Sequence, residues 1–390
     1  MQFAPKSFKL FVVFALSIFL LPAAAQAQHY KQTNLVSDIA GMAPVTDPNL
    51  KNPWGLTRSP TGSPWWVANN NSGTSTLYTG AGAIIPINGT GTVTVPPPGF
   101  APGTQSAPTG VVFNGSATDF LVVPGTPGTA AHFIFATEDG TISAWNSGQN
   151  AVLKVDNSDN GSARGAVYKG ATSGEINGQK FLYVTNFRSA KVEVYDTNFK
   201  RVHLDDDAFE PNGDFDRDDH DRGDHDGDRI PFSFAPFNIQ NIGGTLFVTY
   251  AKQDAPKHDD VPGTGLGFVE IFTTAGKHIG HLEHGDWFNA PWGVVWTTRD
   301  FGEFSNTILV GNFGSGWIAA FNGFTYKFMG FVKAPDDSIL TIDGLWSLTF
   351  ANDGTAGLAN TLYFSAGIND ENDGLFGTIT PVDGLDGDEE

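Results

Sequence analysis

The side chains with the clearest capacity for chemistry gather in one acidic segment, residues 205–229. It holds twelve carboxylates, three arginines and two histidines. Asp214, Asp216 and Asp218 alternate as the ligands of calcium-binding loops do, and Asp226 and Asp228 follow in a similar way. No glutamate stands at the closing position of an EF-hand loop, so an EF-hand is excluded. Two interpretations stay open: calcium binding, or a solvated loop whose charges repel one another.

Asp370 and Asp373 lie in a second acidic turn, residues 369–374. Their oxygens suit a structural cation such as Ca²⁺. The commoner role of Asp and Asn in turns is to accept hydrogen bonds from nearby backbone amides. Both carboxylates are therefore candidate calcium ligands, with turn capping as the alternative, and no other cofactor is expected.

Three histidines, His278, His281 and His284, lie close to Glu283 and Asp286 and raise the possibility of a zinc site. Their context predicts an outer strand, in which successive side chains point to opposite faces. His278 and His281 would then lie on different faces, and we interpret these histidines as surface residues.

No Gly-x-Ser-x-Gly elbow, glycine-rich phosphate loop or metalloprotease motif is present in the sequence. A Ser/His/Asp triad stays open, because such a triad is recognised by its geometry and not by its order in the chain.

The elements that must position these residues follow an internal repeat. Residues 52–57 (NPWGLT) and 289–296 (NAPWGVVW) each place a Pro-Trp-Gly turn before an apolar strand. Four further segments fit the same template of turn and short strands, and the third inner strand is expected at residues 163–168. The aligned turn positions are Gly55, Gly110, Gly165, Phe237, Gly293 and Ser347. Their spacings are 55, 55, 72, 56 and 54 residues, and the long one contains the acidic segment.

Strands alternating with Gly, Pro, Asn and Asp turns at this period predict an all-β fold, a six-bladed β-propeller of four-stranded blades. The last copy lacks a fourth strand, and residues 33–39 are a strand without a partner. Pairing the two would close the ring and remove two exposed sheet edges. We expect one domain over residues 28–382, with the acidic segment as an insert and residues 383–390 as an acidic tail.

The first 27 residues are typical of an export signal. Lys6 and Lys9 precede an apolar run at residues 10–21, and a small-x-small site ends at Ala27. We expect a secreted or periplasmic protein without a membrane span. The chain has no cysteine and a formal charge of −20, which argues against nucleic acid as a partner. We expect a monomer.

Almost the whole mature chain resembles a family of exported bacterial β-propellers with no assigned activity. The motifs that carry the resemblance are Asn34–Asp38, Asn52–Gly55, Asn289–Gly293 and Asn369–Gly377. More distantly, the blades resemble NHL-type and gluconolactonase-type six-bladed propellers, which include binding modules, lactonases and lyases.

Propellers commonly bind ligands at the mouth of the central channel, so the turn before each inner strand is a candidate position. In this chain these positions are Trp54, Thr109, Arg164, Pro236, Trp292 and either Asp343 or Trp346. Resemblance to lactonase-type propellers implies Asn and Asp metal ligands here, and only Asp343 matches. This departure argues against their metal-dependent hydrolysis.

Two interpretations of these positions stay open. In the first, Trp54 and Trp292 stack on a sugar ring or another flat ligand, Arg164 binds a carboxylate, and Thr109 and Asp343 complete the site. In the second, the tryptophans fill the channel as core residues and Arg164 pairs with Asp343.

The function that the sequence favours is a secreted, non-catalytic binding or scaffold propeller with a carbohydrate, small organic ligand or protein partner. The alternative is a secreted hydrolase or lyase acting on a lactone or glycan. An enzyme should bring together two or more carboxylates or histidines with perturbed pKa values, whereas a binding protein should show an aromatic, largely neutral rim.

Overall fold

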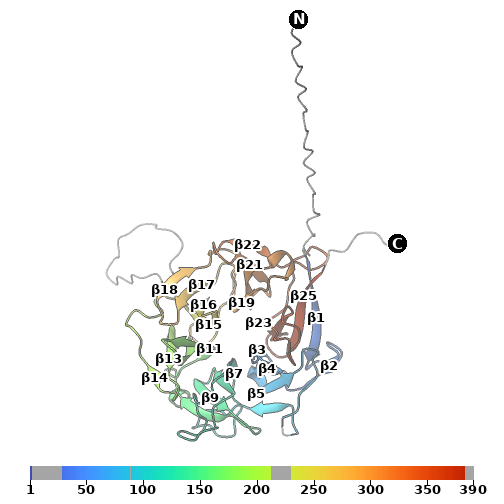
Figure 1. The fold of residues 1–390 in the computed structure, drawn as a ribbon. Helices are drawn as coiled ribbons and strands as arrows, with labels where there is room; N and C mark the ends of the chain where they lie inside the picture. The colour runs from blue at the N-terminus through green and yellow to red at the C-terminus, as the bar shows by residue number, and fades with distance from the viewer. Residues whose placement is uncertain (2–28, 88, 212–229, 383–390) are drawn as a thin grey trace.

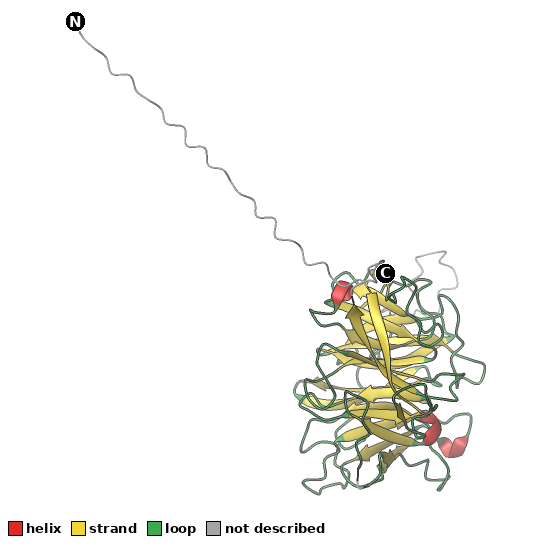
Figure 2. Cartoon of the chain, turned by 90° about the vertical axis from the view of Figure 1, so that its right-hand side faces the viewer, coloured by secondary structure: helices red, strands yellow, loops and turns green. Residues whose placement is uncertain are grey.

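Six β-sheets surround one central axis, as Figure 1 shows for the computed structural model of the chain. The structure describes Met1 and residues 29–382, except residue 88 and residues 212–229. The expected export signal, most of the acidic insert and the acidic tail therefore lie outside the described residues. Almost all of the regular structure is strand (Figure 2), and the prediction of a six-bladed β-propeller is confirmed.

Each blade is an antiparallel sheet whose first strand lies nearest the axis. Blades one to three contain β3 (Pro53–Thr57), β4 (Trp65–Asn69), β5 (Thr74–Tyr78) and β6 (Thr92–Thr94); β7 (Pro108–Phe113), β8 (Phe133–Thr137), β9 (Thr141–Trp145) and β10 (Val152–Asp156); and β11 (Tyr168–Ile176), β12 (Gln179–Asn186), β13 (Lys191–Tyr195) and β14 (Arg201–Val202). Blades four to six contain β15 (Phe234–Ile242), β16 (Thr245–Lys252), β17 (Phe268–Thr273) and β18 (His278–His281); β19 (Pro291–Trp296), β20 (Thr307–Asn312), β21 (Ile318–Asn322) and β22 (Phe328–Phe331); and β23 (Leu345–Phe350), β24 (Leu362–Ala366) and β25 (Leu375–Val382). The three short 3₁₀ helices are η1 (Asn70–Ser72), η2 (Asp159–Gly161) and η3 (Gly302–Phe304).

The ring is closed by the first described strand, β1 (His29–Ser37), which supplies the outer strand of blade six. It pairs antiparallel with β25, as predicted, and the two-residue β2 (Val45–Thr46) pairs with its far side. The buried Ser37 hydroxyl also donates a hydrogen bond of 2.8 Å to the carbonyl of Gly374. Because β1 pairs with β25, blade six is completed and the ring is closed between blade six and blade one.

Each inner strand has an irregularity in its pairing near its start, directly after the first residue in five blades and after Pro236, the third residue, in blade four. The residue that follows is directed to the channel and defines a ring of six equivalent positions. These channel-ring residues are Trp54, Thr109, Lys169, Phe237, Trp292 and Trp346.

The ring corrects two positions that the repeat predicted. The prediction of an inner strand at residues 163–168 is wrong, because residues 157–167 form a loop around η2 and β11 begins only at Tyr168. Lys169, and not Arg164, is therefore the third channel-ring residue. In blade four the ring residue is Phe237, one position after the predicted Pro236.

Apolar residues fill the spaces between neighbouring blades, and a separate cluster fills the channel. No helix in the described part of the chain is long and apolar enough to cross a membrane.

Candidate functional site

The channel is filled by aromatic side chains below its mouth. Trp54 stacks on Trp346 with ring centroids 3.5 Å apart, and Trp292 meets both rings edge-on at 6.3 and 6.0 Å. Phe313 stacks on the other side of Trp346 at 4.0 Å. Trp54 and Trp292 are only 2% and 4% exposed, so they form a buried floor and not an aromatic rim.

One positive charge is set into this floor. The ammonium of Lys169 lies 5.0 Å from the centre of the Trp54 ring and 5.8 Å from that of Phe187, and its side chain is 1% exposed. It pairs with Glu138 and, at 3.3 Å, with Asp259. Burial alone would lower the pKa of Lys169, but these carboxylates outweigh burial and raise it, so the side chain is a fixed cation.

The carboxylates above Lys169 come from loops that follow the second strand of several blades. Because the strands of a blade are antiparallel, the second strand ends where the inner strand begins, and its loop overhangs the channel ring. Glu138 follows β8, residues 258–260 follow β16, and Glu371 follows β24. Neighbouring amides orient two of them: Asn70 donates to Glu138 at 2.6 Å and Asn52 donates to Glu371 at 2.7 Å.

The pKa values of these groups are pushed apart. A hydrogen bond of 2.7 Å from His258, together with the charge of Lys169, holds the pKa of Asp259 well below its ordinary value. Burial raises the pKa of the next residue, Asp260, to about 7, and Lys169 only partly opposes this. Burial also raises the pKa of Glu371, and the hydrogen bond to Asp259 raises that of His258.

Asp260 is the least satisfied member of the group. Its Oδ2 atom is buried and has no hydrogen-bond partner among the described residues. A buried carboxylate without partners is costly when ionised, which explains its raised pKa. Two adjacent carboxylates with divergent pKa values are the arrangement from which acid–base assignments are made in enzymes. We refer to Glu138, Lys169, His258, Asp259, Asp260 and Glu371 as the mouth cluster.

Within the mouth cluster, Lys169 would compete with a metal ion for the carboxylates. The possible ligand atoms of Glu138, His258 and Asp259 all lie within 4.8 Å of one another. Two of these three side chains already pair with the ammonium of Lys169, which supplies the positive charge that an ion would bring. The charge that would attract an ion to these ligands is therefore already partly neutralised.

The other sequence-derived candidates are not members of the mouth cluster. Thr109 is buried in the channel ring, where its hydroxyl donates to the carbonyls of Ala136 and Tyr168 at 3.2 and 2.8 Å. Arg164 is 87% exposed and pairs with Asp159 at 3.2 Å, so the predicted ion pair between Arg164 and Asp343 is wrong. Asp343 is exposed and accepts a hydrogen bond from the backbone amide of Asn369.

The calcium candidates divide into two sets. Asp373 pairs with Lys51 at 3.8 Å and accepts a hydrogen bond from Asn369, while Asp370 is exposed. The remaining candidates lie outside the described residues, and calcium binding there stays a prediction: Asp214, Asp216, Asp218, Asp226 and Asp228.

The prediction that His278 and His281 face opposite ways is wrong. Glu270 pairs with His281 and Phe272 with His278, and Ile279 is left over as a bulge between them. One extra residue reverses the alternation of side chains. As a result, both imidazoles lie close to Glu270.

Sequence analysis missed every member of the mouth cluster, and five of the six lie in the loops described above: Glu138, His258, Asp259, Asp260 and Glu371. A signal was present, because each of them lies shortly after the second strand of a repeat. Lys169 was missed because Gly165 fits the repeat spacing better than Gly170 does.

Comparisons with known proteins give relatives without an assigned activity. No family model matches the chain. It is 28% identical over 367 residues to uncharacterized protein R648 of Acanthamoeba polyphaga mimivirus, covering 90% of this chain and 80% of R648. It is 32% identical over 254 residues to protein R640 of the same virus, covering 64% of this chain and 44% of R640.

Solved structures with a similar arrangement include a streptogramin B lyase, at 11% identity and a TM-score of 0.47, covering 90% of this chain and 97% of that one. A glucose dehydrogenase matches at 12% identity and a TM-score of 0.47, covering 89% and 99%. At these identities no activity is transferred to this chain.

Proposed function

We propose that the protein is a hydrolase or lyase that acts on a small lactone, ester or glycan at the channel mouth. The observation that carries the proposal is the pair Asp259 and Asp260, neighbours whose pKa values are displaced in opposite directions. Perturbed carboxylates beside a buried cation are typical of active sites.

In this proposal Asp260 is the general base. A pKa of about 7 leaves it partly ionised at neutral pH and still basic enough to take a proton from water. The water then attacks the substrate carbonyl, the carbon–oxygen bond of the lactone or ester breaks, and the proton returns to the leaving oxygen. Glu371, whose pKa burial also raises, is the alternative donor of this proton to the leaving oxygen, and it would then recover the proton that Asp260 holds.

The remaining charges restrict the substrate. Lys169 pairs with both Glu138 and Asp259, and the lowered pKa of Asp259 keeps that carboxylate ionised. Four carboxylates against one lysine and one histidine give the mouth cluster a negative charge, which repels anions. We therefore propose a neutral or cationic substrate.

A non-catalytic carbohydrate-binding function has less support. It requires exposed aromatic rings at the mouth, and both Trp54 and Trp292 are buried. The charged residues above them would have to be desolvated by a neutral ligand without contributing to chemistry.

The proposal is tested by screening lactones, nitrophenyl esters and glycosides for turnover. We expect kcat/KM to rise with pH and to level off above about pH 7, as Asp260 ionises. Asp260→Asn should lower kcat by about 100-fold or more. Arg164→Ala, a change at an exposed position outside the mouth cluster, should leave turnover unaltered.

Turnover that survives Asp260→Asn would contradict this assignment. If no compound is turned over but sugars raise the melting temperature, the non-catalytic binding function replaces it. Calcium belongs in the same melting screen, since it tests the predicted ligands of the acidic insert.

We also propose that the protein is exported. This rests on the pattern of residues 1–27, and the membership of a bacterial family rests on the sequence motifs alone, since the relatives found are viral. N-terminal sequencing of protein recovered outside the cytoplasm should begin at Gln28, and an intact N-terminus would contradict it.

A further inference from the structure

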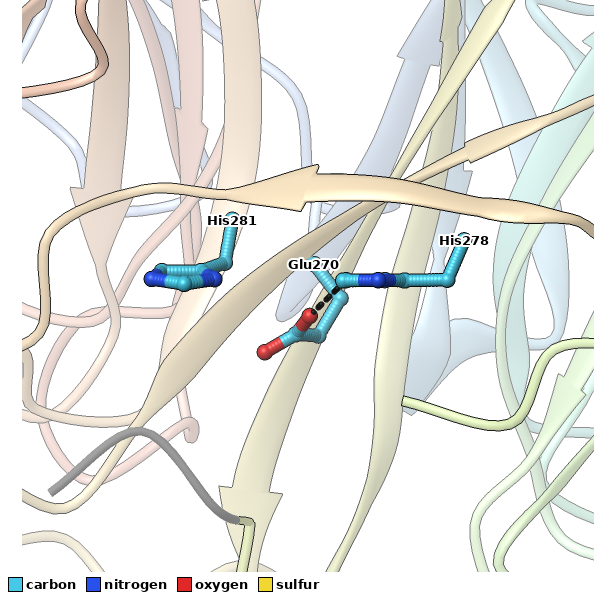
Figure 3. Close-up of side chains that lie close together, drawn as sticks. All are labelled: Glu270, His278 and His281. Atoms are coloured by element: carbon cyan, nitrogen blue, oxygen red, sulfur yellow. Dashed lines mark hydrogen bonds and ion pairs between the residues drawn. The ribbon is translucent and has the colours of Figure 1, made fainter. Parts of the chain in front are cut away.

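Blade four carries a second polar cluster on its two outer strands, β17 and β18, whereas its mouth-cluster residues lie in the loop after β16. Glu270 lies in β17, and His278 and His281 begin and end β18 (Figure 3). We propose that Glu270, His278 and His281 bind a divalent transition-metal ion of the Zn²⁺ type.

The geometry fits a single ion. The carboxylate and imidazole ligand atoms of the three residues all lie within 4.8 Å of one another. Zinc bonds to nitrogen and oxygen are roughly 2.0–2.2 Å long, so ligand atoms around one ion lie no more than about 4.4 Å apart. The ligand atoms therefore have to move closer by no more than about 0.4 Å to come within this limit.

The contact already present is a hydrogen bond that an ion would replace. Glu270 Oε2 and His278 Nε2 are 2.6 Å apart, as the dashed line in Figure 3 marks. Two ligands of one tetrahedral ion stand about 3.3–3.5 Å apart, so binding needs these atoms to separate by less than about 1 Å. The imidazole of His278 is held in place by an edge contact with Phe272, whose ring centre is 5.4 Å away.

An ionised carboxylate at the position of Glu270 lowers the stability of the fold unless a cation compensates its charge. Its side chain is 2% exposed, and its strand packs in the apolar cluster between blades three and four. A buried carboxylate is normally paired with a cation or coordinated to a metal.

Blade five provides an internal comparison. Its β21–β22 hairpin has the same register and the same bulge, with Ala319 facing Phe331 and Phe321 facing Phe328. Ala319, Phe328 and Phe331 therefore occupy the positions of Glu270, His278 and His281. The hairpin forms there with apolar residues alone, so the polar set in blade four is not required to build the bulge.

The ligand types select the class of metal. Two imidazoles and one carboxylate suit Zn²⁺, Co²⁺ or Ni²⁺, whereas Ca²⁺ prefers oxygen ligands only. Three protein ligands leave one position for water or a further ligand.

The proposal is tested by titrating the metal-free, full-length protein with Zn²⁺ in a calorimeter and with Co²⁺ in an absorption spectrometer. The matched variant transplants the blade five residues: Glu270→Ala, His278→Phe and His281→Phe together. We expect one Zn²⁺ per chain in the wild type, with an affinity at least tenfold higher than in the variant, in line with the usual cost of disrupting a metal site, about 10–100-fold.

The variant keeps the acidic insert, whose own histidines and carboxylates offer other ligands, so the difference between the two proteins reports on this site. Zn²⁺ should also raise the melting temperature of the wild type more than that of the variant. Equal affinity in the two proteins, or Co²⁺ spectra without the bands of an ordered site in the wild type, would overturn the proposal. If the triple variant does not fold, His281→Phe alone is compared, since its counterpart Phe331 fits the same register.

Discussion

Replacing Lys169 by methionine should lower the free energy of unfolding by about 3–5 kcal/mol, the usual cost of removing one partner of a buried ion pair. The side chain is 1% exposed and lies between Glu138 and the Trp54 ring. Methionine keeps the contact with the ring but leaves the largely buried carboxylate of Glu138 without the ammonium that pairs with it, and the loss of this pair dominates the effect. Denaturant unfolding followed by tryptophan fluorescence measures the effect.

Two further variants isolate the cause of this loss. The double variant Lys169→Met with Glu138→Gln removes both charges, so it should recover much of the stability that the single variant loses. Lys333→Met breaks an exposed pair with Asp337 and should hardly change unfolding. A double variant as unstable as Lys169→Met would show that the lysine contributes by packing and not by its charge.

Replacing Asp260 by asparagine should stabilise the protein at pH 8, by up to about 4 kcal/mol. Burial raises the pKa of Asp260 to about 7, well above the value near 4 of an unfolded chain. The folded protein therefore carries a cost that is absent below pH 4, grows as the pH rises, and is complete above about pH 7. Asparagine removes the charge, so wild type and variant should converge near pH 4.

The neighbouring residue is a control of opposite sign. The pKa of Asp259 is lowered, so its ionised form stabilises the folded state above the unfolded pKa, and this contribution disappears only in strong acid. Asp259→Asn should therefore lower the melting temperature at neutral pH. Melting curves between pH 4 and 8 decide the matter, and an Asp260→Asn variant less stable than wild type at pH 8 would refute the interpretation of Asp260 as a strained base.

If Asp260→Asn is more stable than the wild type and also loses turnover, the two results together distinguish a catalytic role of Asp260 from a structural one. A residue that serves only packing or hydrogen bonding loses stability when it is replaced. A buried base that function maintains against its own desolvation cost shows the reverse, because the protein bears that cost for catalysis.

The architecture could be predicted because the strands and turns of each blade recur in the sequence at a nearly constant spacing. Pro53-Trp54-Gly55 and Pro291-Trp292-Gly293 repeat since each inner strand begins with the same irregular turn, and Gly55 touches the backbone of Thr109 in the next blade too closely for a side chain. The pairing of β1 with β25 followed from a missing strand at one end of the repeat and a spare one at the other. Local rules were sufficient for both.

The site could not be predicted in the same way, because its chemistry lies in loops that carry no period. Asp260 is ordinary in sequence and becomes unusual only in the fold, where burial raises its pKa and Glu371, more than one hundred residues later, adds to the effect. Sequence analysis placed Arg164 at the third channel-ring position, which Lys169 occupies five residues later. Arg164 was preferred because it has the same charge and fits the repeat spacing better. His278 and His281 were separated by the rule of strand alternation, which the bulge at Ile279 breaks.

Ring closure by β1 and β25 also orders events during synthesis. The strand at residues 29–37 leaves the ribosome long before its partner at residues 375–382 is translated. Blade six therefore cannot be completed until residues 375–382 have been made, and for that period the strand that will close it has an unpaired edge. Contacts across such a separation form slowly, and an open edge invites pairing with another chain. The closed fold therefore requires that the strand at residues 29–37 is protected from other chains until residues 375–382 are available to pair with it.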